Sequence, residues 1–133
     1  MSNIPAVQAI YQSFGAGDVP GILAHISEDV SWEEGRQDHG VPWLKPGRGH
    51  AQVVTFLQTL AEQLDFQHFE PINLLEGGNQ VVGVVRLEAT AKATGKQIVE
   101  PNEAHLWTFG PDGKVTAFCH LADTHQHWAA LQP

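Results

Sequence analysis

Three side chains suited to chemistry stand at alternate positions of one strand-like run: Glu103, His105 and Trp107. Alternate residues of a β-strand point to the same face of the sheet. The run therefore predicts one face that carries a carboxylate, an imidazole and an indole. Carboxylates and imidazoles are the groups that most often move protons in enzymes. Such a face is either the wall of a pocket or a solvated surface, and the sequence leaves both interpretations open.

A further carboxylate, Asp123, ends the last strand-like run and is predicted to share this face at its far end. In a pocket, Asp123 would be a general base that removes a proton next to a carbonyl, because apolar surroundings raise the pKa of a carboxyl group. His105 would then donate a hydrogen bond to the developing enolate oxygen. The plainer alternatives are that Asp123 caps the end of a strand and that His105 is a hydrogen-bonded wall residue.

Tight turns at residues 94–95 and 111–113 separate three strand-like runs and predict an antiparallel meander. A two-residue loop at the first turn would place Arg86 opposite Glu103. On an exposed sheet this would be an ordinary ion pair, contributing about 0–1 kcal/mol. In a pocket, the pair would anchor a polar group of a ligand or, as a weaker alternative, hold a water molecule for hydrolysis.

The second turn, as a three-residue loop, would place Cys119 opposite His105 and therefore on the same face. Phe118 and His120 would then lie on the opposite face. A slip of one residue in either turn would invert part of this assignment. As a pair, Cys119 and His105 could act as a Cys–His nucleophile, but a buried cysteine between apolar neighbours is usually inert, and Cys119 is expected to be so.

Apolar periodicity and turn residues divide the chain into a largely helical first half and a sheet-forming second half. Helices are predicted over residues 4–14, 19–26 and 50–64, with a short helix in the tail, 124–131. Strands are predicted over residues 30–34, 66–76, 81–91, 97–109 and 115–123. This order predicts a single α+β domain over residues 1–133. Within the irregular stretch 35–49, Trp43 either closes a pocket or anchors the loop to the body.

Composition and charge exclude several classes of protein. The net charge is −8, and the seven Lys and Arg residues are spread singly, so no basic patch exists for nucleic acid. No apolar run approaches the roughly 20 residues of a membrane span. The one cysteine forbids an internal disulfide, and a cytoplasmic protein is expected. None of the eight histidines has zinc-site spacing, so no metal is expected.

Several short motifs are similar, in order and spacing, to those of a known family. They are Val30-Ser31-Trp32, Pro46-Gly47-Arg48-Gly49, Thr94-Gly95-Lys96, Gly113-Lys114-Val115 and Asp123-Thr124. From about residue 7 to 131, the chain resembles the SnoaL-like polyketide-cyclase branch of the NTF2-like (ketosteroid isomerase-like) superfamily. The resemblance implies an α+β fold in which a cone-shaped, curved antiparallel sheet wraps over N-terminal helices and encloses an apolar cavity. It also implies a homodimer.

For function, the resemblance implies a cofactor-free isomerase, cyclase or dehydratase that acts on a small hydrophobic ligand of polyketide or steroid type. His105 and Asp123 match the strand histidine and the terminal aspartate of the cyclases in type and order. Tyr11 falls in the first helix, where isomerase relatives place an oxyanion-stabilising tyrosine. Because this fold hosts many functions, two alternatives stay open. One is a non-catalytic ligand-binding or dimerisation module, and the other is a hydrolase with a carboxylate-held water.

The candidate ligand-binding residues are aromatic or charged: Trp32, Trp43, Trp107, Tyr11, Arg86 and Glu103. The three tryptophans would form flat walls for a ring-shaped ligand. For each tryptophan, ordinary packing in the core is an equally good explanation.

Overall fold

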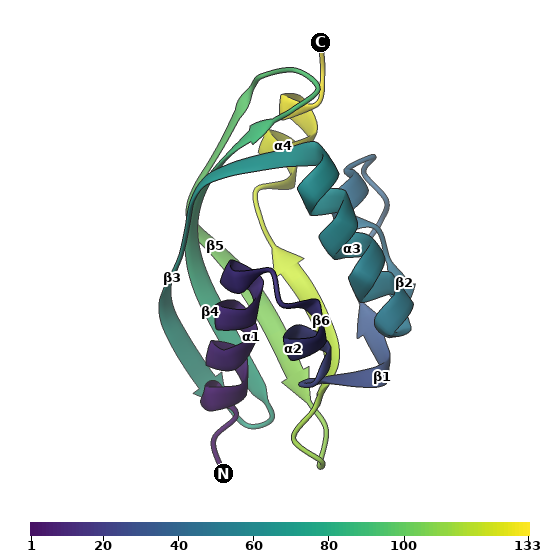
Figure 1. Cartoon of the computed structure of the whole chain (residues 1–133), viewed down its shortest axis with the longest axis vertical. Helices are drawn as coiled ribbons and strands as arrows, with labels where there is room; N and C mark the ends of the chain where they lie inside the picture. The colour runs from purple at the N-terminus through teal and green to yellow at the C-terminus, as the bar shows by residue number, and fades with distance from the viewer.

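The computed structural model describes all 133 residues as an α+β fold (Figure 1). The helices are α1 (Ile4–Ala16), α2 (Val19–Leu23), α3 (Gly49–Gln63) and α4 (Thr124–Ala130), with a 3₁₀ helix η1 (Pro42–Leu44). The strands are β1 (Ile26–Trp32), β2 (Gly47–Arg48), β3 (Leu64–Gly77), β4 (Gln80–Ala91), β5 (Gln97–Phe109) and β6 (Val115–Leu121). No helix combines the length and the apolar composition that a membrane crossing requires.

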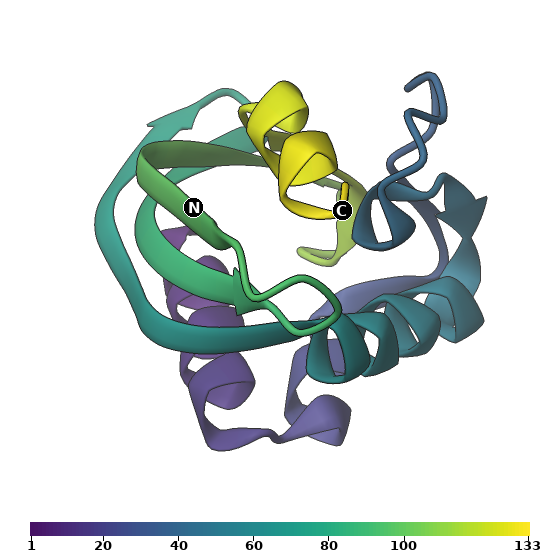
Figure 2. The same cartoon turned by 90° about the horizontal axis from the view of Figure 1, so that it is seen from above.

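The strands form one curved, unclosed sheet in the order β2-β1-β6-β5-β4-β3. All neighbouring strands are antiparallel except β1 and β6, which run parallel. Seen from above, β3, β4 and β5 curl around, and α1 and α3 lie against the open part of the curve (Figure 2). The predicted α+β architecture, a curved sheet wrapped over N-terminal helices, is confirmed.

Helix α1 packs on the sheet through an apolar stripe. Val7, Ile10 and Tyr11, spaced by three and one, are buried, as expected for one face of a helix. The helix ends at Gly17, whose φ of 68° is the left-handed conformation that glycine adopts without strain. This packing brings the Tyr11 ring to 5.9 Å from Trp107 on β5, measured between ring centroids.

The second helix and the first strand differ from their predicted bounds. Helix α2 ends at Leu23, three residues early, and β1 begins at Ile26 instead of residue 30. Tertiary pairing explains the difference, because Ile26 pairs with Val115 at the start of β6. The pairing with β6 therefore extends β1 into a stretch whose local pattern favours a helix.

The predicted pairing of β4 with β5 is wrong by one residue at the site. Glu103 lies opposite Val85, not Arg86. The loop between the strands has four residues, 92–95, and not the predicted two, because Ala91 N–H bonds to the Lys96 carbonyl, and this shifts the register by two residues. One extra residue of β5 between Glu100 and Glu103 shifts it back by one and turns Arg86 to the other face. Proline cannot donate a ladder hydrogen bond and is found at bulges, and Pro101 stands in this bulge. As a result Arg86 is exposed on the outer face of the sheet, across from Glu70 of β3.

The predicted pairing of β5 with β6 is also wrong beyond the turn. Phe109 does pair with Val115, but the register then shifts by one residue. His105 consequently pairs with His120, and Cys119 pairs with Leu106. His120 is buried beside His105, whereas Cys119 is turned away from it, contrary to the predicted faces.

Candidate functional site

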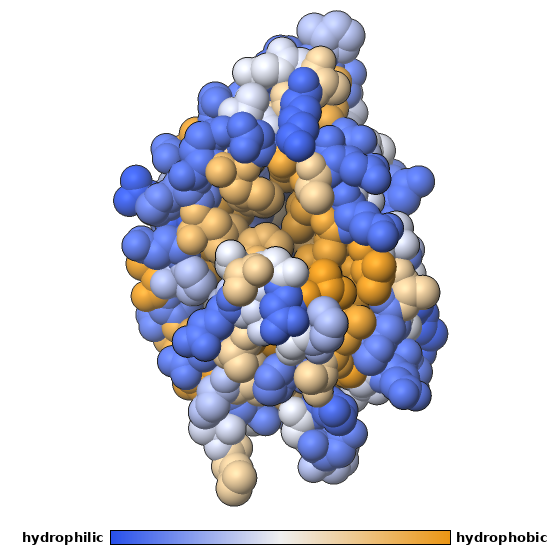
Figure 3. Space-filling model, in the orientation of Figure 1, coloured by the Kyte–Doolittle hydropathy of each residue, from blue (hydrophilic) through white to orange (hydrophobic).

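A cavity opens on the concave side of the sheet. Figure 3 shows a hollow in this face of the molecule with hydrophobic residues around it. The cavity has a volume of about 70 Å³, and 18 of its 22 lining residues are hydrophobic. Because one water molecule needs roughly 10–15 Å³ on this measure, the space admits a small organic molecule.

Aromatic rings form much of the cavity wall. Trp32 stacks on Phe118 with ring centroids 4.2 Å apart, and the Trp107 ring lies 4.4 Å from Phe118. Trp43 of η1 and Tyr11 of α1 also line the cavity. These rings present flat, apolar surfaces to anything that enters.

The first polar group of the wall is a carboxylate–histidine pair, Glu33 and His120. The two Glu33 oxygens accept hydrogen bonds from Nδ1 and from the backbone N–H of His120. Arg36 also donates to Glu33, which is fully buried and has a left-handed backbone with φ 57°. Since Nδ1–H donates to the carboxylate, Nε2 is the ring nitrogen of His120 that is left for another partner. No hydrogen bond uses that Nε2, and His120 lines the cavity.

The second polar group is a hydrogen-bonded chain. Trp107 Nε1 donates to the Tyr11 hydroxyl at 3.2 Å, and that hydroxyl lies 2.8 Å from His105 Nδ1. His105 Nε2 lies 2.7 Å from Glu103 Oε2. With its oxygen occupied by Trp107, Tyr11 donates its proton to His105 Nδ1, and His105 Nε2–H then donates to Glu103. Both nitrogens of His105 are therefore engaged.

Burial and hydrogen bonding set the charges of this chain. Burial raises the pKa of Tyr11 above its ordinary value, so the hydroxyl keeps its proton. Burial also lowers the pKa of His105, and the Glu103 carboxylate offsets only part of this effect. For Glu103, burial alone would raise the pKa, but the hydrogen bond from His105 and the nearby His127 ring hold the pKa well below its usual range. Near neutral pH the chain thus contains a neutral imidazole and an ionised carboxylate.

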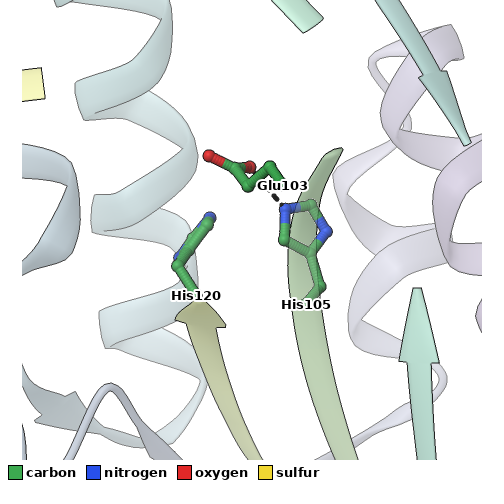
Figure 4. A group of neighbouring side chains, drawn as sticks. All are labelled: Glu103, His105 and His120. Atoms are coloured by element: carbon green, nitrogen blue, oxygen red, sulfur yellow. Dashed lines mark hydrogen bonds and ion pairs between the residues drawn. The ribbon is translucent and has the colours of Figure 1, made fainter. Parts of the chain in front are cut away.

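One oxygen of that carboxylate has no partner. Glu103 is 3% exposed, and its Oε1 makes no hydrogen bond. Figure 4 shows the Glu103 carboxylate beside the rings of His105 and His120, which come from neighbouring strands. Trp32 Nε1 is a second buried atom of the cavity wall without a partner. Buried polar groups are seldom left unpaired in proteins, so these atoms point to a bound molecule.

A third histidine, His127 of α4, also lines the cavity beside Glu103. Its Nε2 lies 2.8 Å from Glu100 Oε2 and 3.5 Å from Glu103 Oε1, and its Nδ1 accepts a hydrogen bond from Trp43 Nε1 at 2.9 Å. Burial alone would lower the pKa of His127, but Glu100 and Glu103 raise it to about 9. The hydrogen bond from Trp43 acts against this increase in pKa, because Nδ1 can accept it only when that nitrogen carries no proton.

We expect Trp43→Phe to raise the pKa of His127 further, because the substitution removes the one group that favours the neutral ring. The measurement is an NMR titration of the histidine ring protons. Trp128→Phe, which alters an exposed tryptophan of α4, is the control and should leave the pKa in place. A lower pKa in Trp43→Phe would contradict the assigned hydrogen bond.

Gly83 is a site residue that sequence reasoning missed. It faces inward on β4 opposite His105, and a Cβ at this position would overlap the Tyr11 hydroxyl. We expect Gly83→Ala to push Tyr11 away from His105 and to destabilise the fold by about 1–3 kcal/mol. Urea unfolding measures this. The control is Gly77→Ala in β3, where a Cβ meets no atom within 4 Å. Equal stabilities would contradict the tight contact.

Asp123 lies away from the cavity, and its predicted place on the cavity face is wrong. Strand β6 ends at Leu121, and Asp123 is an exposed residue that caps α4 by accepting a hydrogen bond from Gln126 N at 3.2 Å. The structure brings together His105, Glu103, Trp107 and Tyr11, and leaves Asp123 and Arg86 outside.

Sequence reasoning also missed Glu33, His120, Glu100 and His127. The one local signal was Pro101 within a strand, which marks the bulge that re-aims the neighbouring side chains. Two groups could hold a metal ion: Glu103, His105 and His120, or Glu100, Glu103 and His127, each with ligand atoms within 4.8 Å. In both groups a histidine Nε2 is already committed to a carboxylate, so a metal would have to displace that hydrogen bond.

The comparisons with known proteins agree with this architecture. A family model described as a SnoaL-like domain matches residues 7–118. An NTF2-like protein of Burkholderia thailandensis is 26% identical with a TM-score of 0.85, over 100% of this chain and 99% of that chain. An NTF2-like protein of Burkholderia xenovorans is 25% identical with a TM-score of 0.85, over 98% of this chain and 95% of that chain.

A third similar structure comes from a co-crystallisation with a small molecule. TerC, co-crystallised with polyporic acid, is 29% identical with a TM-score of 0.75, over 96% of this chain and 98% of that chain. No curated protein matches the sequence significantly. Because the family model spans most of the residues, from the first helix to the last strand, the chain belongs to the SnoaL-like domain family.

Proposed function

We propose that this protein is a cofactor-free acid–base enzyme that removes a proton next to a carbonyl of a small, largely apolar molecule, in a reaction of the isomerase, cyclase or dehydratase type. The observation that carries the proposal is the Glu33–His120 pair, which presents an unpartnered Nε2 to an apolar cavity. A histidine whose Nδ1 is held by a buried carboxylate is a well-oriented general base. His120 thus takes the role that the sequence suggested for Asp123.

In this mechanism His120 Nε2 accepts the proton from carbon, and Glu33 stabilises the imidazolium that forms. The negative charge moves to the carbonyl oxygen of the substrate. Trp32 Nε1–H, an unpartnered donor in the same wall, would donate to that oxygen. Because both nitrogens of His105 are engaged, His105 positions the Glu103 carboxylate and does not donate to the substrate.

The family supports the proposal. TerC, a similar protein, was co-crystallised with a small molecule, polyporic acid. A second candidate function, a binding module without chemistry, is favoured by the largely hydrophobic lining. The two candidates differ in whether a base is needed, and this difference can be measured.

The test uses 5-nitrobenzisoxazole, a flat neutral compound whose ring opens to a coloured phenolate when a base removes its C–H proton. Wild-type protein should open the ring at least about 10²-fold faster than free imidazole at equal concentration. Asp123→Asn, which changes only an exposed helix cap, should keep the full rate. A wild-type rate no higher than that of imidazole would reject the enzyme in favour of the binding module.

We also propose a homodimer that forms through the outer face of the sheet. Large apolar side chains are exposed on its strands: Ile72, Leu75, Val99 and Leu121. A second copy would remove this surface from water. Light scattering on the purified protein should give twice the mass of one chain, and the mass of a single chain would overturn the proposal.

A further inference from the structure

We infer that the cavity selects a neutral molecule that carries a hydroxyl group for Glu103 Oε1, and that it rejects carboxylic acids. The inference rests on the proposed function in taking this cavity as the substrate site. It names the class of substrate: a small hydroxy-carbonyl compound, bound through its hydroxyl and its carbonyl at the polar end of an aromatic pocket.

The open oxygen of Glu103 requires a donor. Oε2 is held by His105 at 2.7 Å, but Oε1 makes no hydrogen bond, and the side chain is 3% exposed. The nearest protein group, His127 Nε2, lies 3.5 Å from Oε1 and donates to Glu100 at 2.8 Å. A ligand hydroxyl would therefore make a charge-assisted hydrogen bond that no protein group provides.

The charges around the polar end exclude an anion. Glu33, Glu100 and Glu103 are all buried there, and no Lys or Arg lines the cavity. Arg36 pairs with Glu33, and its guanidinium also donates to the backbone carbonyl of His120. His127, whose pKa is raised to about 9, is a cation in the cavity wall, but its Nε2 already faces Glu100 and Glu103. An incoming carboxylate would therefore lose its hydration beside three carboxylates and find no free cation to pair with.

The carbonyl of the ligand has a partner of its own. Trp32 Nε1–H is buried, unpartnered and in the cavity wall. Ligand atoms of Glu103 and His120 lie within 4.8 Å of each other, so one small ring reaches both the hydroxyl acceptor and the base. The pocket thus offers an acceptor, a donor and a base to a single neutral molecule.

The test measures binding of three ring compounds of similar size: p-cresol, 4-fluorotoluene and 4-methylbenzoate. The first carries a hydroxyl, the second replaces it with fluorine that cannot donate, and the third is an anion at neutral pH. Binding is followed by the ¹⁵N–¹H signal of Trp32 Nε1, assigned with Trp32→Phe. We expect p-cresol to bind at least about 10-fold more tightly than 4-fluorotoluene, a difference expected for a hydrogen bond to a charged group. 4-Methylbenzoate should not bind.

Glu103→Gln should reduce the difference between p-cresol and 4-fluorotoluene to less than about threefold. It should also weaken the rejection of 4-methylbenzoate, because one of the three buried carboxylates is gone. Glu70→Gln, which removes an exposed carboxylate from β3, is the matched control and should keep the wild-type order. If Glu103→Gln does not fold, the order of the three affinities measured on the wild-type protein still tests the inference. Tighter binding of 4-fluorotoluene or 4-methylbenzoate than of p-cresol would overturn the inference.

The binding test and the ring-opening test distinguish failure of this inference from failure of the proposed function. Binding in the expected order without ring opening would reject the enzyme and leave the selectivity in place. Ring opening with a different order of binding would keep the base and reject the role of Glu103 Oε1.

Discussion

Replacing His120 with glutamine is expected to lower the rate of 5-nitrobenzisoxazole ring opening by at least about 10²-fold. Glutamine can keep a hydrogen bond to Glu33, but it has no basic nitrogen to take the proton. KM should change little, because the apolar walls that hold the ring stay in place. The effect should therefore appear in kcat.

The control for this substitution is His125→Gln, which changes an exposed histidine of α4 and should leave the rate unchanged. Glu33→Gln separates positioning from chemistry, because the amide can still accept from Nδ1–H but cannot stabilise an imidazolium by charge. Its kcat should fall between those of wild type and His120→Gln. Adding free imidazole to His120→Gly should restore part of the rate. Retention of more than half of the wild-type rate in a folded His120→Gln would reject His120 as the base.

The part of the site that lies on one strand could be predicted from the sequence. Glu103, His105 and Trp107 follow the two-residue period of β5, and all three are buried on the cavity face. Alternation along a single strand is a local property, so it does not depend on how the neighbouring strands are paired.

The partners of these residues could not be predicted, because the pairing between strands depends on bulges. One extra residue beside Pro101 in β5 and one at Thr116 in β6 each shift the register by one position. Since a shift by one turns every following side chain to the other face, Arg86 moved out of the site and His120 moved in. The turn sequences alone contain no information about bulges further along the strands.

The contacts of Glu33 could not be predicted from the sequence for another reason. Glu33 is 87 residues from His120, and the two meet only because β1 runs parallel to β6 and places Trp32 beside Phe118. The fold itself was predictable, because its motifs and the order of its elements are properties of the whole chain. Asp123 shows the limit of such motifs. The aspartate of the motif is present in the sequence, but in the structure it caps helix α4 and does not face the cavity.

Replacing Glu33 with alanine is expected to destabilise the protein by about 3–5 kcal/mol, the usual cost of breaking a buried ion pair. The Glu33 carboxylate is fully buried, and its loss would leave Arg36 Nε and both His120 donors without their partner. Alanine would also keep the left-handed backbone at φ 57° without any side-chain contact to hold it. Urea unfolding, followed by tryptophan fluorescence, measures the change.

The neighbouring residue provides a matched control. Glu34 pairs with Arg48 at 2.9 Å, but both side chains are exposed, at 38% and 63%, so Glu34→Ala should cost no more than about 1 kcal/mol. Glu33→Gly separates the two contributions at position 33, because glycine adopts the left-handed backbone without strain. Glu33→Gly should therefore be less destabilising than Glu33→Ala, yet still far more so than Glu34→Ala. If Glu33→Ala and Glu34→Ala cost the same, Glu33 does not hold β1, Arg36 and His120 together, and the orientation of the proposed base would need another cause.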